Sequence, residues 1–467
     1  MKTFWQKINS KDNLVYQHTK DFFYGYSFPV LVAFLAFLSY AFNISLIGMG
    51  IIVLVVCFLF FFYEELTPFF PLMLTWLFSF SDKSIFSEKI WILLIIVSPV
   101  LPLLIIRLIK FNRKFKPGML LASLLTVCIA LFSGGLFSWD LNNYASGLSC
   151  ILTVGPLLVV VYCFFRNYVH PTKEVNLKVY FSYVLTIAGC LVSAELFLHV
   201  VPKSNVLHHT LGWGQTNAGA TFIATTIFFS LYLACKTKHG VLALFGYLFQ
   251  FAGIVASKSD AVFAIVTIFT PIAFFLCLFL SKKEIRLRLI SLLLLFLFLF
   301  SVFVIVGTAT GFLQPIVERF SQNLTSDSGR LKIYQKAWDL FKRNPAFGVG
   351  LGGFYDHSTL GYTPGFIKIY YFHSTLMQVI ACMGIVGIFA YAYYFYSRYK
   401  IIMLKRNLFT TIAFIAFTVF SIYGMIDCCE FYATPTMLTA TQLIAFVEII
   451  NVEKGKADAL PLSIFKS

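Results

Sequence analysis

Residues 328–387 read SGRLKIYQKAWDLFKRNPAFGVGLGGFYDHSTLGYTPGFIKIYYFHSTLMQVIACMGIVG and form the main polar island of a mostly apolar chain. The island opens with a basic amphipathic segment and breaks at Asn344-Pro345. It then passes through a glycine-rich turn and re-enters an apolar helix at His373. A long polar loop that leads a histidine to the end of a membrane helix is an unusual use of residues. We therefore expect the active region here.

The composition predicts an all-α polytopic membrane protein. The chain has 467 residues, of which 59% are hydrophobic and 12% charged, whereas soluble domains carry about 25% charged residues. The net charge of +16 is typical of basic cytoplasmic loops. No soluble domain combines basic and aromatic residues, so we expect no nucleic-acid binding. The ten cysteines form no CxxC pair and are expected to be small buried hydrophobes.

Apolar runs close to bilayer length recur along the chain and predict about fourteen membrane helices. These runs cover residues 27–43, 44–63, 66–80, 90–107, 118–137, 147–165, 178–199, 217–235, 239–256, 261–280, 288–309, 373–397, 408–426 and 432–450. The third run is short and contains Pro68 and Pro71. Without it, the basic clusters that follow would lie outside the cell, so the positive-inside rule favours a crossing.

This sidedness predicts one membrane domain with a single large extracytoplasmic loop that contains surface helices. Basic clusters, including Arg398-Lys400-Lys405-Arg406, then fall in cytoplasmic loops. The N-terminal segment lacks a short apolar core with a cleavage site and is predicted to be a cytoplasmic tail. The predicted divisions are a tail at 1–26, eleven helices in 27–309, the loop at 310–372, three helices in 373–450 and a cytoplasmic tail at 451–467.

Isolated ionisable residues gather at the predicted outer ends of the helices. They are Glu195, His199, His208, His209, Lys258, Asp260, His373, Asp427 and Glu430. Charges at membrane depth are costly and usually line a cavity or a substrate path. The pattern therefore indicates one site at the outer leaflet, although the alternative is that helix ends are simply polar.

A helix is predicted to begin at Arg330, after the capping run at 326–328. Its apolar face, which predicts a helix lying on the membrane surface, would consist of Leu331, Tyr334, Trp338 and Phe341. Arg330 and Lys332 lie at the helix start, where a guanidinium fork and free backbone N–H groups suit a phosphate or diphosphate. The alternative is that these charges anchor the helix to lipid headgroups.

His373 is the strongest single candidate for catalysis. A neutral imidazole near pH 7 is suited to accept a proton from a hydroxyl group, while the alternative is a structural or interfacial histidine. Neither histidine nor carboxylate follows four residues later, which argues against a zinc pair. Gly384 and Gly387 on the same helix predict the close approach of another helix.

These residues resemble the O-antigen ligase and polymerase family of bacterial membrane glycosyltransferases. The matching pattern is a histidine followed by Ser or Asn, a nine-residue gap and GxxG, here His373-Ser374 with Gly384 and Gly387. Residues 328–354 look like the family's arginine-led helix with its Asn-Pro and Gly-x-Gly-x-Gly turn. GQTNAGA at 214–220 and the region of Asp427 are weaker matches.

The resemblance implies a donor glycan on undecaprenyl diphosphate and an active site that faces the periplasm or cell exterior from the bacterial inner membrane. Arg330 and His373 would be catalytic: Arg330 would hold the diphosphate, and His373 would orient or deprotonate the acceptor hydroxyl, with inversion at the anomeric carbon. The implied substrate-binding residues are Lys258, Lys332, Arg319, Asn217 and Asp427. Lys258 stands where the family often has an arginine, and an ammonium cannot form a bidentate fork.

The resemblance also implies the partners: a lipid-linked oligosaccharide, a glycan or lipid acceptor, membrane lipids, a flippase and a chain-length regulator. No metal or other cofactor is expected, since the diphosphate is already a good leaving group. The long chain favours a polymerase of O-antigen or capsule repeat units, and a ligase acting on lipid A-core is the alternative. A transporter would need charges near mid-membrane, often in broken helices related by a repeat, and we see no repeat.

Overall fold

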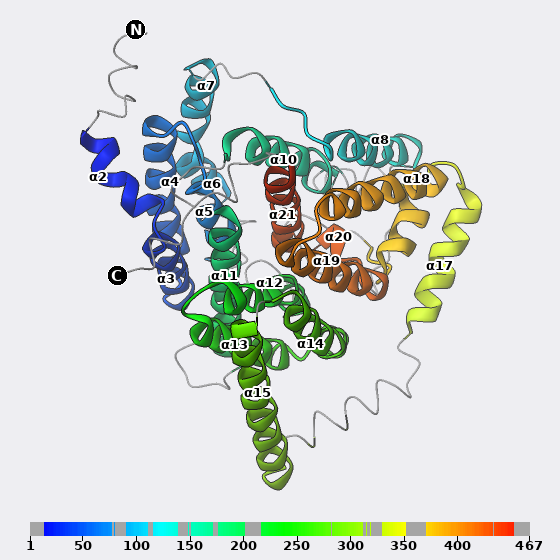
Figure 1. Cartoon of the computed structure of the whole chain (residues 1–467). Coiled ribbons are helices and arrows are strands. Elements are labelled where there is room, and N and C mark those ends of the chain that lie inside the picture. The colour runs from blue at the N-terminus through cyan, green and yellow to red at the C-terminus, as the bar shows by residue number, and fades with distance from the viewer. Residues whose placement is uncertain are drawn as a thin grey trace.

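The computed structural model describes residues 14–76, 79, 90–110, 115–138, 148, 151–170, 176–200, 216–281, 283–311, 314, 318, 329–351, 370–432 and 434–452. Within these ranges the regular elements are helices, and no strand is present (Figure 1). The predicted all-α class is therefore confirmed.

The predicted apolar runs all contain helices. The described helices in the first half of the chain are α2 (Leu14–Phe23), which precedes the first run, α3 (Ser27–Ala41), α4 (Ser45–Phe62), α5 (Phe69–Trp76), α6 (Ile90–Val97), α7 (Val100–Lys110), α8 (Leu121–Ser138), α10 (Pro156–Tyr168) and α11 (Leu177–Val200). The second half adds α12 (Thr216–Lys236), α13 (Gly240–Ala256), α14 (Asp260–Leu280), α15 (Lys283–Ala309), α17 (Arg330–Arg343), α18 (Thr375–Met403), α19 (Leu408–Ile426), α20 (Cys429–Tyr432) and α21 (Thr434–Val452).

Among the described residues, 8 helices are long and apolar enough to cross a membrane. Several shorter apolar helices, such as α3 and α13, accompany them. The chain is thus a multi-pass membrane protein, while the full number of crossings stays a prediction. α15 extends away from the bundle in Figure 1, and only 7% of its most apolar window is buried.

The helix in the third apolar run, α5, has only 8 residues. Even so, the segment that contains it runs the length of α4. At one end of α4, the Ser45 hydroxyl donates to the Ser79 carbonyl at 2.7 Å. Beyond the other end of α4, the Leu66 N–H donates to the Tyr168 carbonyl at 2.8 Å. The segment between Leu66 and Ser79 therefore begins near one end of α4 and finishes at the other, which supports the predicted crossing.

Each end of α21 contacts helix ends that the charge pattern places on its own side of the membrane. Near its end, Glu448 accepts from Arg166 Nε at 3.1 Å and from the Met119 N–H at 3.0 Å. These residues belong to ends predicted to be cytoplasmic. Near its start, the Thr436 hydroxyl donates to the Ala218 carbonyl at 3.5 Å, at an end predicted to be outside. The contacts therefore agree with one consistent sidedness.

α12 forms the centre of the bundle and is buried along its apolar length. It packs against α11, α13, α14, α19 and α21. Gln250 of α13 accepts from the Thr226 hydroxyl at 2.9 Å and donates to the Ser230 hydroxyl at 2.9 Å, both on α12. In a membrane such paired polar groups hold helices together. α12 therefore provides a fixed frame for the elements that carry the site.

α18 is broken at Gly384, where φ is +59° and ψ is −150°. A break in a membrane helix frees backbone groups that lipid cannot satisfy. The glycine-rich turn 345–350 satisfies them: the Val349 and Gly350 N–H groups donate to the Ala381 and Cys382 carbonyls, each at 2.9 Å. In return, the N–H groups of residues 385 and 386 donate to the carbonyls of residues 345 and 346 at 2.9 and 3.1 Å. We call these four hydrogen bonds the backbone clasp.

The clasp corrects the prediction made for the Gly-x-x-Gly pair. A Cβ on Gly384 would lie 2.5 Å from the Pro345 carbonyl oxygen, so a turn rather than a helix approaches there. A Cβ on Gly387 would meet Met383 of its own helix. α8 does pack along α18, but its own Gly134 permits the close contact, with a Cβ there 2.5 Å from the Cys382 carbonyl oxygen.

We expect Gly384→Ala to lower stability by about 2 kcal/mol, because alanine would be strained at positive φ and would press on the Pro345 carbonyl. Thermal unfolding in detergent, followed by size-exclusion chromatography, measures the loss as a lower Tm. Gly50→Ala in α4 is the matched control, since nothing lies within 4 Å of a Cβ at that residue. Equal Tm values for the two variants would contradict the importance of the clasp.

Candidate functional site

α17 begins at Arg330, as predicted, directly after Gly329 with φ +70°. It packs against α18, and its Ala337 and Leu340 are buried. Leu331 and Trp338 of the predicted apolar face are 65% and 51% exposed. They lie off the stripe that Ala337 and Leu340 bury against the protein, and the contact of this face with the membrane surface stays a prediction. Tyr334, by contrast, points toward the start of α18.

His373 lies at the start of α18 in the left-handed region, with φ +47°. That conformation is uncommon for a residue with a side chain and is often found at functional sites. The backbone is held on both sides: the Tyr334 hydroxyl donates to the His373 carbonyl at 3.1 Å, and the His373 N–H interacts with the Cys428 sulfur. The imidazole itself remains 39% exposed and is accessible to a substrate.

Asp427 fixes the orientation of this imidazole. Its Oδ1 lies 3.4 Å from His373 Nδ1 and accepts the Cys428 N–H at 2.9 Å. Its Oδ2 accepts from the Tyr423 hydroxyl at 3.1 Å. The carboxylate is 6% exposed, so its place is behind the histidine. With Nδ1 directed at the carboxylate, Nε2 is the nitrogen left to act on a substrate.

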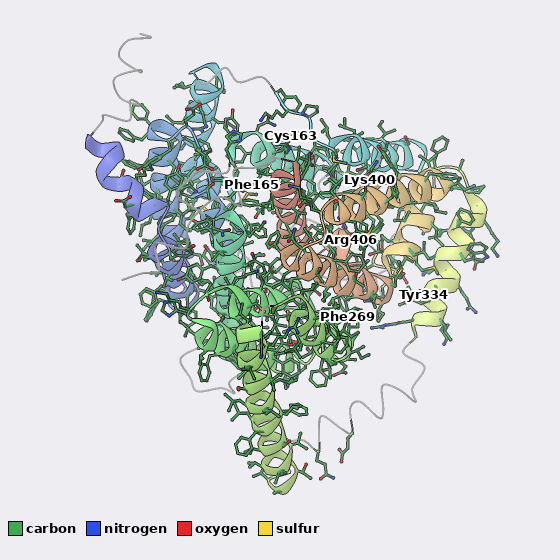
Figure 2. The ribbon with its side chains drawn as sticks, in the orientation of Figure 1. Cys163, Phe165, Phe269, Tyr334, Lys400 and Arg406 are labelled. Atoms are coloured by element: carbon green, nitrogen blue, oxygen red, sulfur yellow. The ribbon has the colours of Figure 1, made fainter. Side chains whose placement is uncertain are left out.

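Arg330 also acts on this group of residues, because its charge affects the pKa of the Tyr334 hydroxyl. Burial raises the pKa of Tyr334, the positive charge of Arg330 lowers it, and the charge of Asp427 raises it. Arg330 and Asp427 therefore both lie within electrostatic range of one hydroxyl, which in turn contacts His373. Figure 2 labels Tyr334 on α17, beside the first half of α18. We call Arg330, Tyr334, His373, Asp427 and Cys428 the His373 cluster.

Tyr334 and Cys428 are members of the cluster that the sequence did not single out. Tyr334 was assigned to an apolar face, although it follows Arg330 by one helical turn and shares its side of the helix. That spacing is a signal that points to it. Cys428 directly follows Asp427, but its sulfur contact with the His373 backbone has no signature in the sequence.

The remaining predicted site residues lie on other parts of the chain, and their roles stay predictions. Lys332 is exposed on α17, and Lys258 is exposed in the turn before α14, with φ +57°. Asn217 lies in the first turn of α12, a helix that contacts α20. Arg319 lies outside the described residues. Arg330, His373 and Asp427 thus all lie within range of Tyr334, and the place of Lys258 beside them stays a prediction.

The predicted outer set of charges is only partly one site. Glu195 is buried close to the Tyr40 hydroxyl of α3. Glu430 is paired with Arg398, which lies buried inside α18 rather than in a cytoplasmic loop as predicted. That prediction was wrong because α18 continues to Met403 and Arg398 has a carboxylate partner within the protein. His208 and His209 lie outside the described residues.

A multi-pass helical membrane protein, with an arginine and a half-exposed histidine gathered beside one broken helix, is the class that fold and site define. Residues 243–392 match the family model described as O-antigen ligase. The match includes Arg330 and His373 and supports membership of the O-antigen ligase/polymerase family. It thereby supports a membrane glycosyltransferase of the ligase or polymerase type. No curated protein matches the chain.

The buried Cys428 thiol is expected to resist alkylation in the folded protein. Burial raises its pKa well above the ordinary 9.0, and the neighbouring Asp427 charge adds to the increase. The folded state therefore keeps a proton that the unfolded state loses, and this contribution to stability falls as the pH rises through about 9. Maleimide labelling of membranes at pH 8.5, mapped by peptide mass spectrometry, tests this expectation. Cys428 should react only after unfolding in SDS, and rapid labelling before unfolding would contradict it.

Proposed function

We propose that the chain transfers a glycan from undecaprenyl diphosphate to an acceptor hydroxyl at the outer leaflet of the bacterial inner membrane. The observation that carries the proposal is that the Tyr334 hydroxyl, which donates to the His373 carbonyl at 3.1 Å, also lies within electrostatic range of Arg330. An anion-binding group and a proton acceptor side by side are what a diphosphate donor and a hydroxyl acceptor require.

Arg330 is proposed to bind the diphosphate. It is the first residue of α17. The first N–H groups of a helix lack partners within it and carry the positive end of its dipole. A guanidinium fork beside them suits two phosphate oxygens. Lys332 is proposed to add positive charge, and Lys258, Arg319 and Asn217 stay predicted donor contacts.

His373 is proposed to act as the general base. Its Nε2 takes the proton of the acceptor hydroxyl while that oxygen forms a bond to the anomeric carbon. The bond from the anomeric carbon to the phosphate oxygen breaks, and the diphosphate leaves with the electron pair, stabilised by Arg330. The anomeric configuration inverts in this single displacement. Asp427 stabilises the imidazolium and holds its ring in place, as carboxylates behind catalytic histidines do.

The acceptor distinguishes two candidates within this chemistry. We favour a polymerase that joins O-antigen or capsule repeat units, on the basis of the chain length and the number of apolar runs. The description of the matching family favours the second candidate, an O-antigen ligase that acts on lipid A-core or another acceptor. The same His373 cluster serves either acceptor, since both offer a sugar hydroxyl.

His373→Ala and Arg330→Ala are each expected to reduce transfer strongly. Loss of a general base costs about 100–10,000-fold in rate, and loss of one preorganised charge about 100–1,000-fold. Transfer from a purified lipid-linked donor, with membrane abundance measured in parallel, gives the result. The matched controls are Arg343→Ala at the other end of α17 and His239→Ala in the exposed turn before α13. Full activity in both cluster variants would refute the assignment.

Deletion of the gene is expected to shorten the surface polysaccharide to single repeat units if the protein is a polymerase. Polysaccharide gels of whole cells and of the lipid-carrier fraction measure this length. A ligase would instead leave long chains on the carrier, absent from their surface acceptor. Polysaccharide of normal length and normal attachment would contradict both candidates.

A further inference from the structure

A buried ion pair lies beside the His373 cluster and takes no part in the proposed chemistry. Arg398 Nη1 lies 2.6 Å from Glu430 Oε1, and Nη2 lies 3.0 Å from Oε2. The two side chains are 1% and 3% exposed. The guanidinium also lies over the Tyr394 ring, 3.8 Å from its centroid. Charges within a membrane protein are costly even when paired, so this pair calls for an explanation.

The pair holds α20, the four-residue helix Cys429–Tyr432 that follows Asp427. A single helical turn is too short to be stable by itself. α20 packs on α18, α19 and α21, and Glu430 gives it a bidentate link to α18. Asp427 lies three residues before Glu430, so a displacement of α20 would carry the Asp427 carboxylate away from His373.

Because α18 is bent, its start can contact Asp427 while its second half contacts Glu430. His373 at its start contacts Asp427, and Arg398 in its second half contacts Glu430. A straight helix would separate residues 373 and 398 by about 37 Å, whereas residues 427 and 430 lie at most about 11 Å apart. Figure 1 shows the two halves of α18 running in different directions on either side of the break at Gly384.

We infer that Arg398 and Glu430 are a positioning pair, which sets Asp427 and Cys428 against the imidazole and backbone of His373. This inference rests on the proposed function and deepens it. The pair touches no substrate; it acts through Asp427 on the direction of Nε2. The contacts form one closed path, from His373 along α18 to Arg398, across to Glu430, and back through Asp427.

The test replaces the pair by apolar residues of similar size, Arg398→Met with Glu430→Leu. Such replacements often leave stability unchanged, because they remove both charges at once. We expect a Tm close to that of the wild type but a kcat about 100-fold lower, the typical cost of a misplaced catalytic group. The KM for the lipid-linked donor should change little, since Arg330 is untouched. Lys400→Met, two residues further along α18 and exposed, is the matched control.

A double-mutant cycle separates positioning from mere support of the fold. If the pair acts through Asp427, the apolar replacement should lower kcat much less in an Asp427→Asn background than in the wild type. An apolar variant with normal Tm and wild-type kcat would overturn the inference. So would equal losses in the two backgrounds.

A readout without donor distinguishes failure of the inference from failure of the proposed function. In protein with nitrogen-15 in its histidines, the His373 ring signal is the one missing from His373→Gln. We expect the apolar variant to shift that signal while the signals of the other histidines stay in place. An unshifted His373 signal would overturn the inference whatever the protein transfers. A shifted signal with full activity in His373→Ala would instead overturn the proposed function.

Discussion

The demand that backbone groups within a bilayer find hydrogen-bond partners governs this structure. α18 breaks at Gly384, and a broken membrane helix is tolerated only where other parts of the protein take up the freed groups. The turn 345–350 takes them through the four bonds of the backbone clasp. Since α17 leads directly into that turn, the clasp fixes α17 against α18. The packing of α17 beside α18 is therefore a consequence of how one helix break is satisfied.

The same break also shapes the other side of the site. It redirects the second half of α18, which then carries Arg398 to Glu430 and stabilises α20. α20 in turn holds Asp427 at His373. Figure 2 shows Lys400 and Arg406 at the end of α18 and in the turn after it, away from Tyr334. One bend thus gathers chemistry from three segments at a single point while the basic end of the helix stays apart.

Much of this arrangement follows from local patterns in the sequence. Apolar runs predict the helices, because membrane helices need one continuous apolar stretch, and the cap and charge pattern predicts the start of α17 at Arg330. The long-range pairings do not follow. Arg398 was assigned to a loop because the charge rule counts a basic residue without knowing of a buried partner. The Gly-x-x-Gly pair predicts helix packing because the sequence shows only the glycines and does not reveal that Gly384 adopts a positive φ.

The way the break is satisfied also bears on the choice between transfer and transport. Transporters use broken helices to present unwound carbonyls to an ion or substrate near mid-membrane. In the described part of α18, the carbonyls of Ala381 and Cys382 accept instead from the turn. The break is therefore a fixed bend, and the backbone groups that it frees form hydrogen bonds with the turn. A fixed bend suits an enzyme site whose groups must keep their positions while the acceptor oxygen displaces the diphosphate. Alternating access in a transporter instead needs helices that move past one another. On this ground the transferase is the better account of the fold.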